Sequence, residues 1–306
     1  MKALTRWWFE PVALGRIAVL RALVYAFIWI DVLVTTSWIS QHADVPGELY
    51  RPLEIGRLLA LPIPTAGFVQ GVMVALLATA AVAAWGRAPR LLGWTVALLY
   101  LEWMVIGQSY GKVDHDRFAF LVLLFAMATV GRARWGDRTP SEAAGWAVKV
   151  TMVAVVATYF LSVFAKARYG EGLVNWLESA TISWAILRRG TFLADPLLQH
   201  PWMVQASQYG LVALELLSPL LLLLRGRARY ALVALYVAFH LVTFATIRII
   251  FLPHLVAMLV FLPLELLPLE VLRHARLPTS RWRRHRDGRP DPPATERQRE
   301  VSPANA

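Results

Sequence analysis

Long apolar runs are the feature that most restricts what this chain can fold into. A helix needs roughly 20 mostly apolar residues to cross the hydrocarbon core of a bilayer. Eight segments approach that length, at residues 15–38, 66–85, 90–108, 116–131, 146–167, 205–224, 229–247 and 249–267. Only 17% of the 306 residues are charged and 58% are hydrophobic, which leaves too few polar side chains to cover a water-soluble domain. The sequence predicts an all-α integral membrane protein, a bundle of about eight transmembrane helices surrounded by the lipid bilayer.

The charge pattern predicts the orientation of these helices. Three short basic loops, GRAPR, GRARWGDR and RGRAR, fall on the same side of the membrane when every segment is counted as a span. Cytoplasmic loops carry an excess of Lys and Arg, so this side is predicted to be cytoplasmic. With an even number of spans, both termini are predicted to lie on the cytoplasmic side of the cell membrane. The fourth segment has only 16 residues, about 24 Å as a helix, so we expect it to be sunk within the bundle or to begin below the outer surface.

The end of the chain differs in composition from the rest. Residues 273–306 hold nine of the 31 Lys and Arg residues, several Pro and few apolar side chains. Such a segment cannot bury enough apolar surface to fold, so we predict a disordered cytoplasmic tail after a transmembrane domain at residues 1–272. The net charge of +11 follows from this tail and the basic loops, and we expect no nucleic-acid partner.

The chain lacks several familiar sources of chemistry. It has no Cys, which excludes thiol catalysis, disulfides and Cys-ligated zinc or iron–sulfur sites. It has no GxGxxG, P-loop or HExxH pattern, and its Ser residues lie in no nucleophile-like context. The DHD triplet around His115 is a poor metal site, because consecutive helical residues point about 100° apart. We therefore expect no metal.

Ionisable residues inside the apolar segments are the strongest functional signal. A charge at membrane depth is costly, so such residues usually pair, line a cavity or carry function. In the predicted topology, most of them lie late in helices that run outward or early in one that runs inward. The sequence therefore predicts one polar cavity in the outer half of the bundle, to which these residues contribute: Asp31, Glu102, His115, Lys166, His240 and Arg248.

Lys166 has two interpretations. In a dry pocket the charged form is disfavoured, and a neutral amine at working pH is a competent general base. Alternatively, Lys166 lies one turn from the helix end, where it extends outward to the interface or pairs with Glu102 or Glu178. The residues alone leave both interpretations open.

Three further residues carry similar alternatives. His115 is oriented by neighbouring carboxylates as an acid, base or hydrogen-bond donor, or else Asp114 or Asp116 simply caps the fourth helix. His240 lies on an otherwise apolar face, where a His is more often a satisfied core residue than a ligand. Glu215 has no opposite charge nearby in sequence, so it must find a partner across the bundle or stay protonated.

Several short motifs occur in an order that resembles a known family. Arg21 and Asp31 lie in the first segment, HDRF begins the fourth, and YFLSVFAK ends the fifth. LELLSPLLLL lies in the sixth segment, and FHLVTFATIRIIFLP joins the seventh to the eighth. Over roughly residues 10–268 this order is similar to the HTTM domain, the horizontally transferred transmembrane domain. That family includes vitamin K-dependent gamma-glutamyl carboxylase.

The resemblance implies a specific chemistry. In the carboxylases, a Lys that ends a helix containing Tyr-Phe deprotonates a reduced naphthoquinone, whose oxygenation to an epoxide generates the strong base for glutamate carboxylation. Lys166 takes that place after Tyr159 and Phe160, and His115 and His240 match two further His residues of the family. The implied catalytic residues are Lys166 and His115. The implied lining of a menaquinol-like or vitamin K-like site is His240, Glu215, Tyr159 and Arg248.

Two departures weaken the carboxylase interpretation. Ala165 stands where the carboxylase has a second Lys, and the sequence shows no large domain beyond the membrane to hold a protein substrate. Quinol binding or epoxidation is therefore better supported than carboxylation, and it is open whether the chain is an enzyme.

Two other functions stay open. One is a permease or carrier for a small anion or lipid, with Lys166, Arg21 and Arg248 supplying positive charge along a path. The other is a non-catalytic scaffold for a partner membrane protein. A carrier needs a polar path to both faces, whereas inner halves such as VMVALLA are nearly free of ionisable groups.

Overall fold

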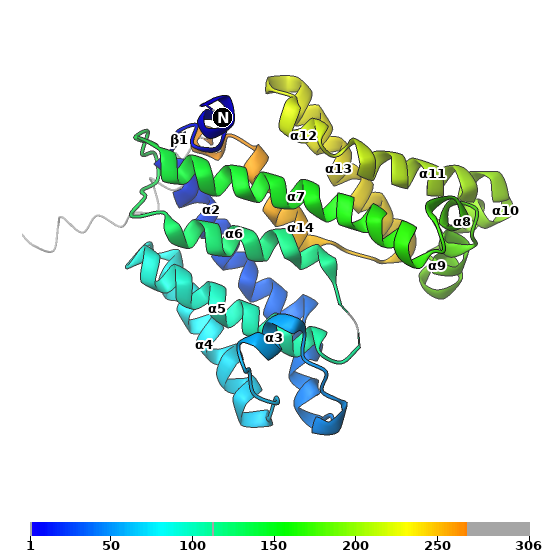
Figure 1. The fold of residues 1–306 in the computed structure, drawn as a ribbon, viewed down its shortest axis with the longest axis horizontal. Coiled ribbons are helices and arrows are strands. Elements are labelled where there is room, and N and C mark those ends of the chain that lie inside the picture. The colour runs from blue at the N-terminus through cyan, green and yellow to red at the C-terminus, as the bar shows by residue number, and fades with distance from the viewer. Residues whose placement is uncertain (1, 112, 268–306) are drawn as a thin grey trace, which may run out of the picture. The chain divides into compact units, whose positions relative to one another are not determined.

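Six long helices form the frame of the chain. The computed structural model describes residues 2–111 and 113–267 (Figure 1). Within this part, six helices are long and apolar enough to cross a membrane, with the π-helix Asp31–Thr35 extending the first and α12 (Leu220–Leu223) extending the fifth. The six are α2 (Leu14–Ile30), α4 (Ala66–Ala84), α5 (Pro89–Gln108), α7 (Glu142–Tyr169), α11 (Pro201–Leu217) and α13 (Gly226–Ile247). This architecture fits the predicted all-α membrane protein.

Two of the eight predicted segments form shorter helices. The fourth is α6 (Phe118–Thr129), which follows the 3-10 turn His115–Arg117. The eighth contains α14 (Leu252–Ala257), continued by the 3-10 turns Met258–Phe261 and Leu264–Leu266. Pro253 lies in the first turn of α14, and Pro263 lies between the two 3-10 turns that follow it, positions that suit a residue unable to continue a helix. The structure thus shows six helices of spanning length, and a count of eight spans stays a prediction.

The predicted tail lies outside the described residues. Short elements complete the part that the structure describes: α1 (Lys2–Trp8), the strands β1 (Val12–Ala13) and β2 (Pro140–Ser141), the 3-10 turns Ser37–Asp44 and Gly47–Leu49, α3 (Glu54–Leu58), α8 (Leu173–Leu177), α9 (Thr181–Arg189) and α10 (Asp195–Gln199). The two strands pair antiparallel, Val12 with Ser141 and Ala13 with Pro140. This pairing ties the start of α2 to the start of α7.

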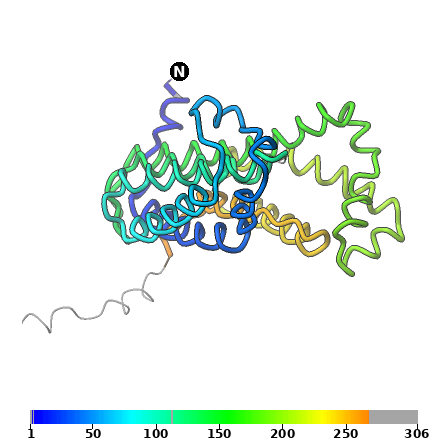
Figure 2. Tube along the Cα trace, turned by 90° about the horizontal axis from the view of Figure 1, so that it is seen from below, coloured from blue at the N-terminus to red at the C-terminus, as the bar shows by residue number. Residues whose placement is uncertain are grey.

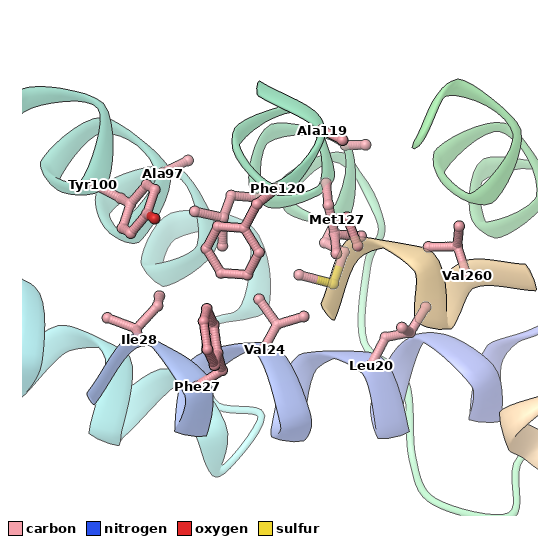
Figure 3. Close-up of a cluster of buried hydrophobic side chains, with 14 of the residues drawn as sticks. Leu20, Val24, Phe27, Ile28, Ala97, Tyr100, Ala119, Phe120, Met127 and Val260 are labelled. Atoms are coloured by element: carbon pink, nitrogen blue, oxygen red, sulfur yellow. The ribbon is translucent and has the colours of Figure 1, made fainter. Parts of the chain in front are cut away.

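The core lies between α2, α4, α5, α6 and α7. α6 packs against both α5 and α7, and most of its apolar side chains are buried, which agrees with a helix sunk within the bundle. Phe120 of α6 makes edge-on contacts with Phe27 at 5.4 Å and Tyr100 at 5.1 Å between ring centres (Figure 3). Such aromatic contacts add to the burial of apolar area.

The last long helices are covered much less. Only 17% of the apolar stretch of α13 is buried within the protein, against 61% of that of α7. Most side chains of α13 therefore face away from the protein. In a bilayer that surface contacts lipid. The segment between α7 and α11, which includes α8, α9 and α10, packs at the end of α7 where α11 begins (Figure 2). This is the end at which Lys166 lies.

Candidate functional site

Lys166 lies in the last turn of α7 and forms a buried ion pair with α11. Its Nζ donates to both carboxylate oxygens of Glu215 at 2.8 Å and 2.8 Å, and to Ser162 Oγ at 2.6 Å. Ser162 Oγ in turn donates to Glu215 Oε1 at 2.9 Å. The side chains of Lys166 and Glu215 are only 13% and 8% exposed. Glu215 has found its partner across the bundle, and that partner is Lys166.

The contacts of Lys166 show which residue it pairs with, and so bear on the second of its two interpretations. It pairs with a carboxylate, but neither Glu102 nor Glu178 is its ion-pair partner. Residues four apart lie on one face of a helix, which brings Ser162 beside Lys166. The indole of Trp176 lies 5.2 Å from Nζ and covers the ammonium.

Tyr159 begins a cluster of aromatic and imidazole rings next to this pair. Its hydroxyl lies 2.9 Å from His240 Nε2 on α13, and its ring packs edge-on against His254 of α14 at 4.8 Å. His240 lies 5.6 Å from His254 and 5.0 Å from Phe251 between ring centres. The ring of Tyr236 packs against that of Tyr159 in a tilted arrangement, with 4.8 Å between ring centres. We call Tyr159, Tyr236, His240, Phe251 and His254 the ring cluster.

The ring cluster contains polar atoms without partners. His240 Nδ1 and both ring nitrogens of His254 are buried and accept or donate no hydrogen bond within the described residues. His254 is 1% exposed and His240 is 4% exposed. Because buried polar groups are nearly always hydrogen-bonded, three free imidazole nitrogens in one cluster indicate a place for a polar ligand group or water. His240 is therefore only partly satisfied by the described residues, through the contact of its Nε2 with Tyr159.

His115 connects the ring cluster to a cavity of about 230 Å³. Its ring lies 6.1 Å from that of Phe251, and both residues line the cavity together with Arg189 and Arg248. Burial lowers the pKa of His115, and the positive charge of Lys166 lowers it further. A neutral imidazole results, which offers one donor and one acceptor.

Arg248 reaches the cavity through an unusual backbone. It ends α13 in the left-handed region, with φ of 55°, and an extended stretch then leads to Phe251. A non-Gly residue in this region is uncommon and costs about 1–3 kcal/mol. The turn places Arg248 and Phe251 on the lining of one cavity.

Acidic residues hold the HDRF motif in place. Arg117 contacts Asp116 at 3.0 Å and Asp31 at 3.4 Å, and Tyr100 donates to the other oxygen of Asp31 at 2.8 Å. Asp114 occupies the N-cap position of the 3-10 turn His115–Arg117, but its side chain makes no capping hydrogen bond there, and the N-cap of α6 is Arg117. These ion pairs hold Arg117, which lines the cavity together with His115.

Two of the predicted polar residues lie apart from this site. The guanidinium of Arg21 donates to the carbonyls of Met127, Val130 and Gly131 and so caps the C-terminal end of α6. Glu102 is 8% exposed, and its Oε1 has no partner among the described residues.

The site is divided where the sequence predicted one cavity. His115 and Arg248 line the cavity, whereas Lys166 and Glu215 do not. The ring cluster, which includes Tyr159 and His240, reaches the cavity only through Phe251. Within residues 2–111 and 113–267, no group of three or more His, Cys, Asp or Glu side chains is placed to hold a metal ion.

Sequence reasoning missed some residues of the site. Ser162 was recognisable from its position one turn before Lys166, and Tyr236 from its position one turn before His240. Lys149 was also missed as a buried charge, although it lies within the fifth segment; its Nζ donates to Glu10 at 2.7 Å. The pairing of each charge depends on packing between helices, which local spacing does not reveal.

Comparisons with known proteins find no matching family model, no matching curated protein and no matching solved structure. The resemblance to the HTTM domain stays a prediction that depends on the order of the motifs quoted above.

Proposed function

We propose that this chain is a multi-pass membrane protein of the HTTM type that binds a lipophilic quinol, a reduced naphthoquinone of the menaquinol class. One observation carries the proposal. Tyr159, His240, His254, Phe251 and His115 form a continuous series of ring contacts between the Lys166–Glu215 pair and the cavity. This series brings together side chains of α7, α13, α14 and the turn before α6.

The residues present suit a flat ring that carries hydroxyl groups. Phe251 and the two Tyr rings offer apolar faces, and ligand sites of this kind are mostly apolar with a few placed polar groups. The free nitrogens of His240 and His254 and the neutral imidazole of His115 offer hydrogen-bond acceptors or donors for the hydroxyls. A quinol reaches such a site from the bilayer, because it partitions into lipid.

The Lys166–Glu215 pair is the proposed proton acceptor. As an ion pair it can take up one proton overall, at the Glu215 carboxylate or at the Lys166 amine once its own proton has passed to Glu215. Ser162 donates to Glu215 and accepts from Lys166, so it links the two groups. Lys166 is therefore proposed as base in combination with Glu215, and His115 as the hydrogen-bond partner of the second hydroxyl.

A bound quinol and one molecule of oxygen would together give the quinone epoxide and water: one oxygen atom would enter the ring, and the other would leave as water with the two hydroxyl protons. An oxygen-dependent, epoxidase-like reaction is the catalytic form of the proposal. Quinol binding does not require it, and binding is tested separately.

One experiment separates these possibilities. The protein is purified from a menaquinone-containing membrane, extracted and analysed for naphthoquinone by mass spectrometry, and oxygen uptake with reduced naphthoquinone is recorded. We expect bound naphthoquinone in the native chain, loss of oxygen uptake in Lys166→Met, and loss of binding in Tyr159→Phe combined with His240→Phe.

A control variant exists on the same helix. Lys149→Met removes another buried Lys that pairs with a Glu, at the opposite end of α7, and should keep both binding and uptake. If the native chain carries no naphthoquinone and consumes no oxygen with the reduced form, the proposal is wrong.

A carrier is the second candidate, because the structure adds a polar cavity at the other end of α7. This cavity, of about 270 Å³, is lined by Lys149 and Arg229 among others, so the inner half of the bundle is less apolar than its sequence suggests. Uptake of a labelled small anion into proteoliposomes, abolished by Lys166→Met, would favour this function over quinol binding.

A further inference from the structure

The cavity at the start of α7 has an unusual charge distribution. Its volume is about 270 Å³, and its polar lining consists of Glu10, Arg16, Lys149, Arg229 and Glu265. These residues come from the chain before β1, from α2, α7 and α13, and from the 3-10 turn Leu264–Leu266. It lies at the end of the bundle where the basic RGRAR loop begins α13, far along α7 from Lys166.

Both carboxylates of the cavity are already paired. Arg16 forms a two-pronged ion pair with Glu265, at 2.6 Å from Nε and 2.5 Å from Nη2. Lys149 Nζ donates to Glu10 at 2.7 Å. These contacts hold the pKa of Glu10 below its usual range, chiefly through the hydrogen bond from Lys149, so Glu10 is ionised at neutral pH.

Arg229 is the cation of the cavity lining that takes part in neither of these two ion pairs. Its Nε donates to the Leu224 carbonyl at 2.7 Å, which fixes the orientation of the guanidinium. No carboxylate in the described part of the chain forms an ion pair with it. Arg16, Arg225 and Glu10 all act on it electrostatically. Among the residues that line the cavity, Arg16, Lys149 and Arg229 set three positive charges against the two carboxylates, an excess of one.

We propose that this cavity binds a phosphate group, with the terminal nitrogens of Arg229 as its main contact. The planar guanidinium fork matches two phosphate oxygens, and the lining keeps one positive charge in excess, because its two carboxylates form their ion pairs with Arg16 and Lys149. The phosphate belongs to an anionic lipid head group or to a free phosphate compound. Basic pockets between membrane helices bind such head groups, and the largely uncovered surface of α13 next to Arg229 gives lipid access from the side.

A pair of variants on one helix tests the proposal. Arg229→Gln removes the cavity cation, whereas Arg227→Gln removes the same charge from an exposed residue two positions away that does not line the cavity. The full chain is reconstituted in nanodiscs of phosphatidylcholine with increasing phosphatidylglycerol, and bound phosphatidylglycerol is counted by native mass spectrometry. A second arm adds inorganic phosphate to the detergent-solubilised chain and measures binding by calorimetry.

The two arms separate the sources of phosphate. Binding of phosphatidylglycerol that weakens about tenfold in Arg229→Gln and less than twofold in Arg227→Gln supports a head group, and the same pattern with inorganic phosphate supports a free phosphate compound. Equal weakening in both variants, or no binding in either arm, overturns the proposal. Should Arg229→Gln fail to fold, Arg229→Lys replaces it: weaker binding is expected, because an ammonium cannot form the two-pronged contact, and unchanged binding contradicts it. None of these outcomes depends on whether the outer site binds a quinol.

Discussion

At the scale of single residues, the Lys166–Glu215 pair is the most consequential contact. Removal of one partner leaves the other charge buried, so Lys166→Met should destabilise the chain by about 3–5 kcal/mol. Replacement of both, Lys166→Met with Glu215→Leu, should recover most of that loss, because a buried pair is about as stable as apolar side chains of similar size. Reversible unfolding in mixed micelles measures both variants. A double variant as unstable as the single one would contradict the pairing.

The same pair separates a structural role from a catalytic one. A double variant that is stable and still binds quinol but consumes no oxygen supports a role in proton transfer. A double variant with native oxygen uptake would limit the pair to structure.

His115 gives the native chain a pH dependence of known sign. Burial and the charge of Lys166 hold its pKa below the ordinary value of 6.5, so the unfolded chain takes up a proton more readily than the folded one. As the pH falls below about 6.5, the native chain should therefore lose stability relative to His115→Gln. Unfolding of both chains at several pH values between about 7.5 and 5 measures the difference. A constant difference over that range would contradict the buried position of His115.

The sequence located the buried polar residues of this region better than it located their partners. Lys166, Glu215 and His240 stood out because a polar group in an apolar helix is costly. Their partners depend on how α7 packs against α11 and α13, which no local pattern encodes. Both sequence-based partners of Lys166 were wrong for this reason.

At the scale of elements, close packing of α7 against the chain before β1 needs Gly145. A Cβ at this position would overlap the carbonyl oxygen of Glu10, a backbone atom that cannot move without displacing the β1–β2 pair. Gly145→Ala should therefore cost about 1–3 kcal/mol or more. Gly71→Ala, where α4 has open space, should be neutral or stabilise by up to about 1 kcal/mol. Thermal unfolding in detergent compares them, and a harmless Gly145→Ala would contradict this packing.

Helix lengths show where element prediction succeeds and fails. Hydrophobic runs located six helices of spanning length because lipid exposure and burial both require apolar side chains. The fourth segment was predicted to be short and is short, whereas the apolar residues of the eighth continue through turns, so its helix is shorter than the apolar run. At the fourth segment Arg21 closes the end of α6, and at the eighth Pro253 and Pro263 limit the helix.

At the scale of the whole molecule, the orientation in the membrane is a prediction from the basic loops. The chain has no Cys, so a single introduced Cys is the only thiol that a maleimide can label. Val113→Cys, on an exposed loop at the outer end, should react with a membrane-impermeant maleimide on intact cells, and Arg134→Cys should react only after permeabilisation. The reverse pattern would place the ring cluster on the cytoplasmic side.

The most direct test of the central claim is photo-crosslinking with a diazirine-bearing menaquinol analogue, followed by peptide mapping of the full chain in native lipid. The account predicts adducts on peptides that contain His115 and on the stretch from Arg248 to His254, and predicts that excess menaquinol prevents them. Adducts confined to the uncovered lipid-facing surfaces of α4 or α13, at a level that excess menaquinol does not change, would show that the ring cluster is no quinol site.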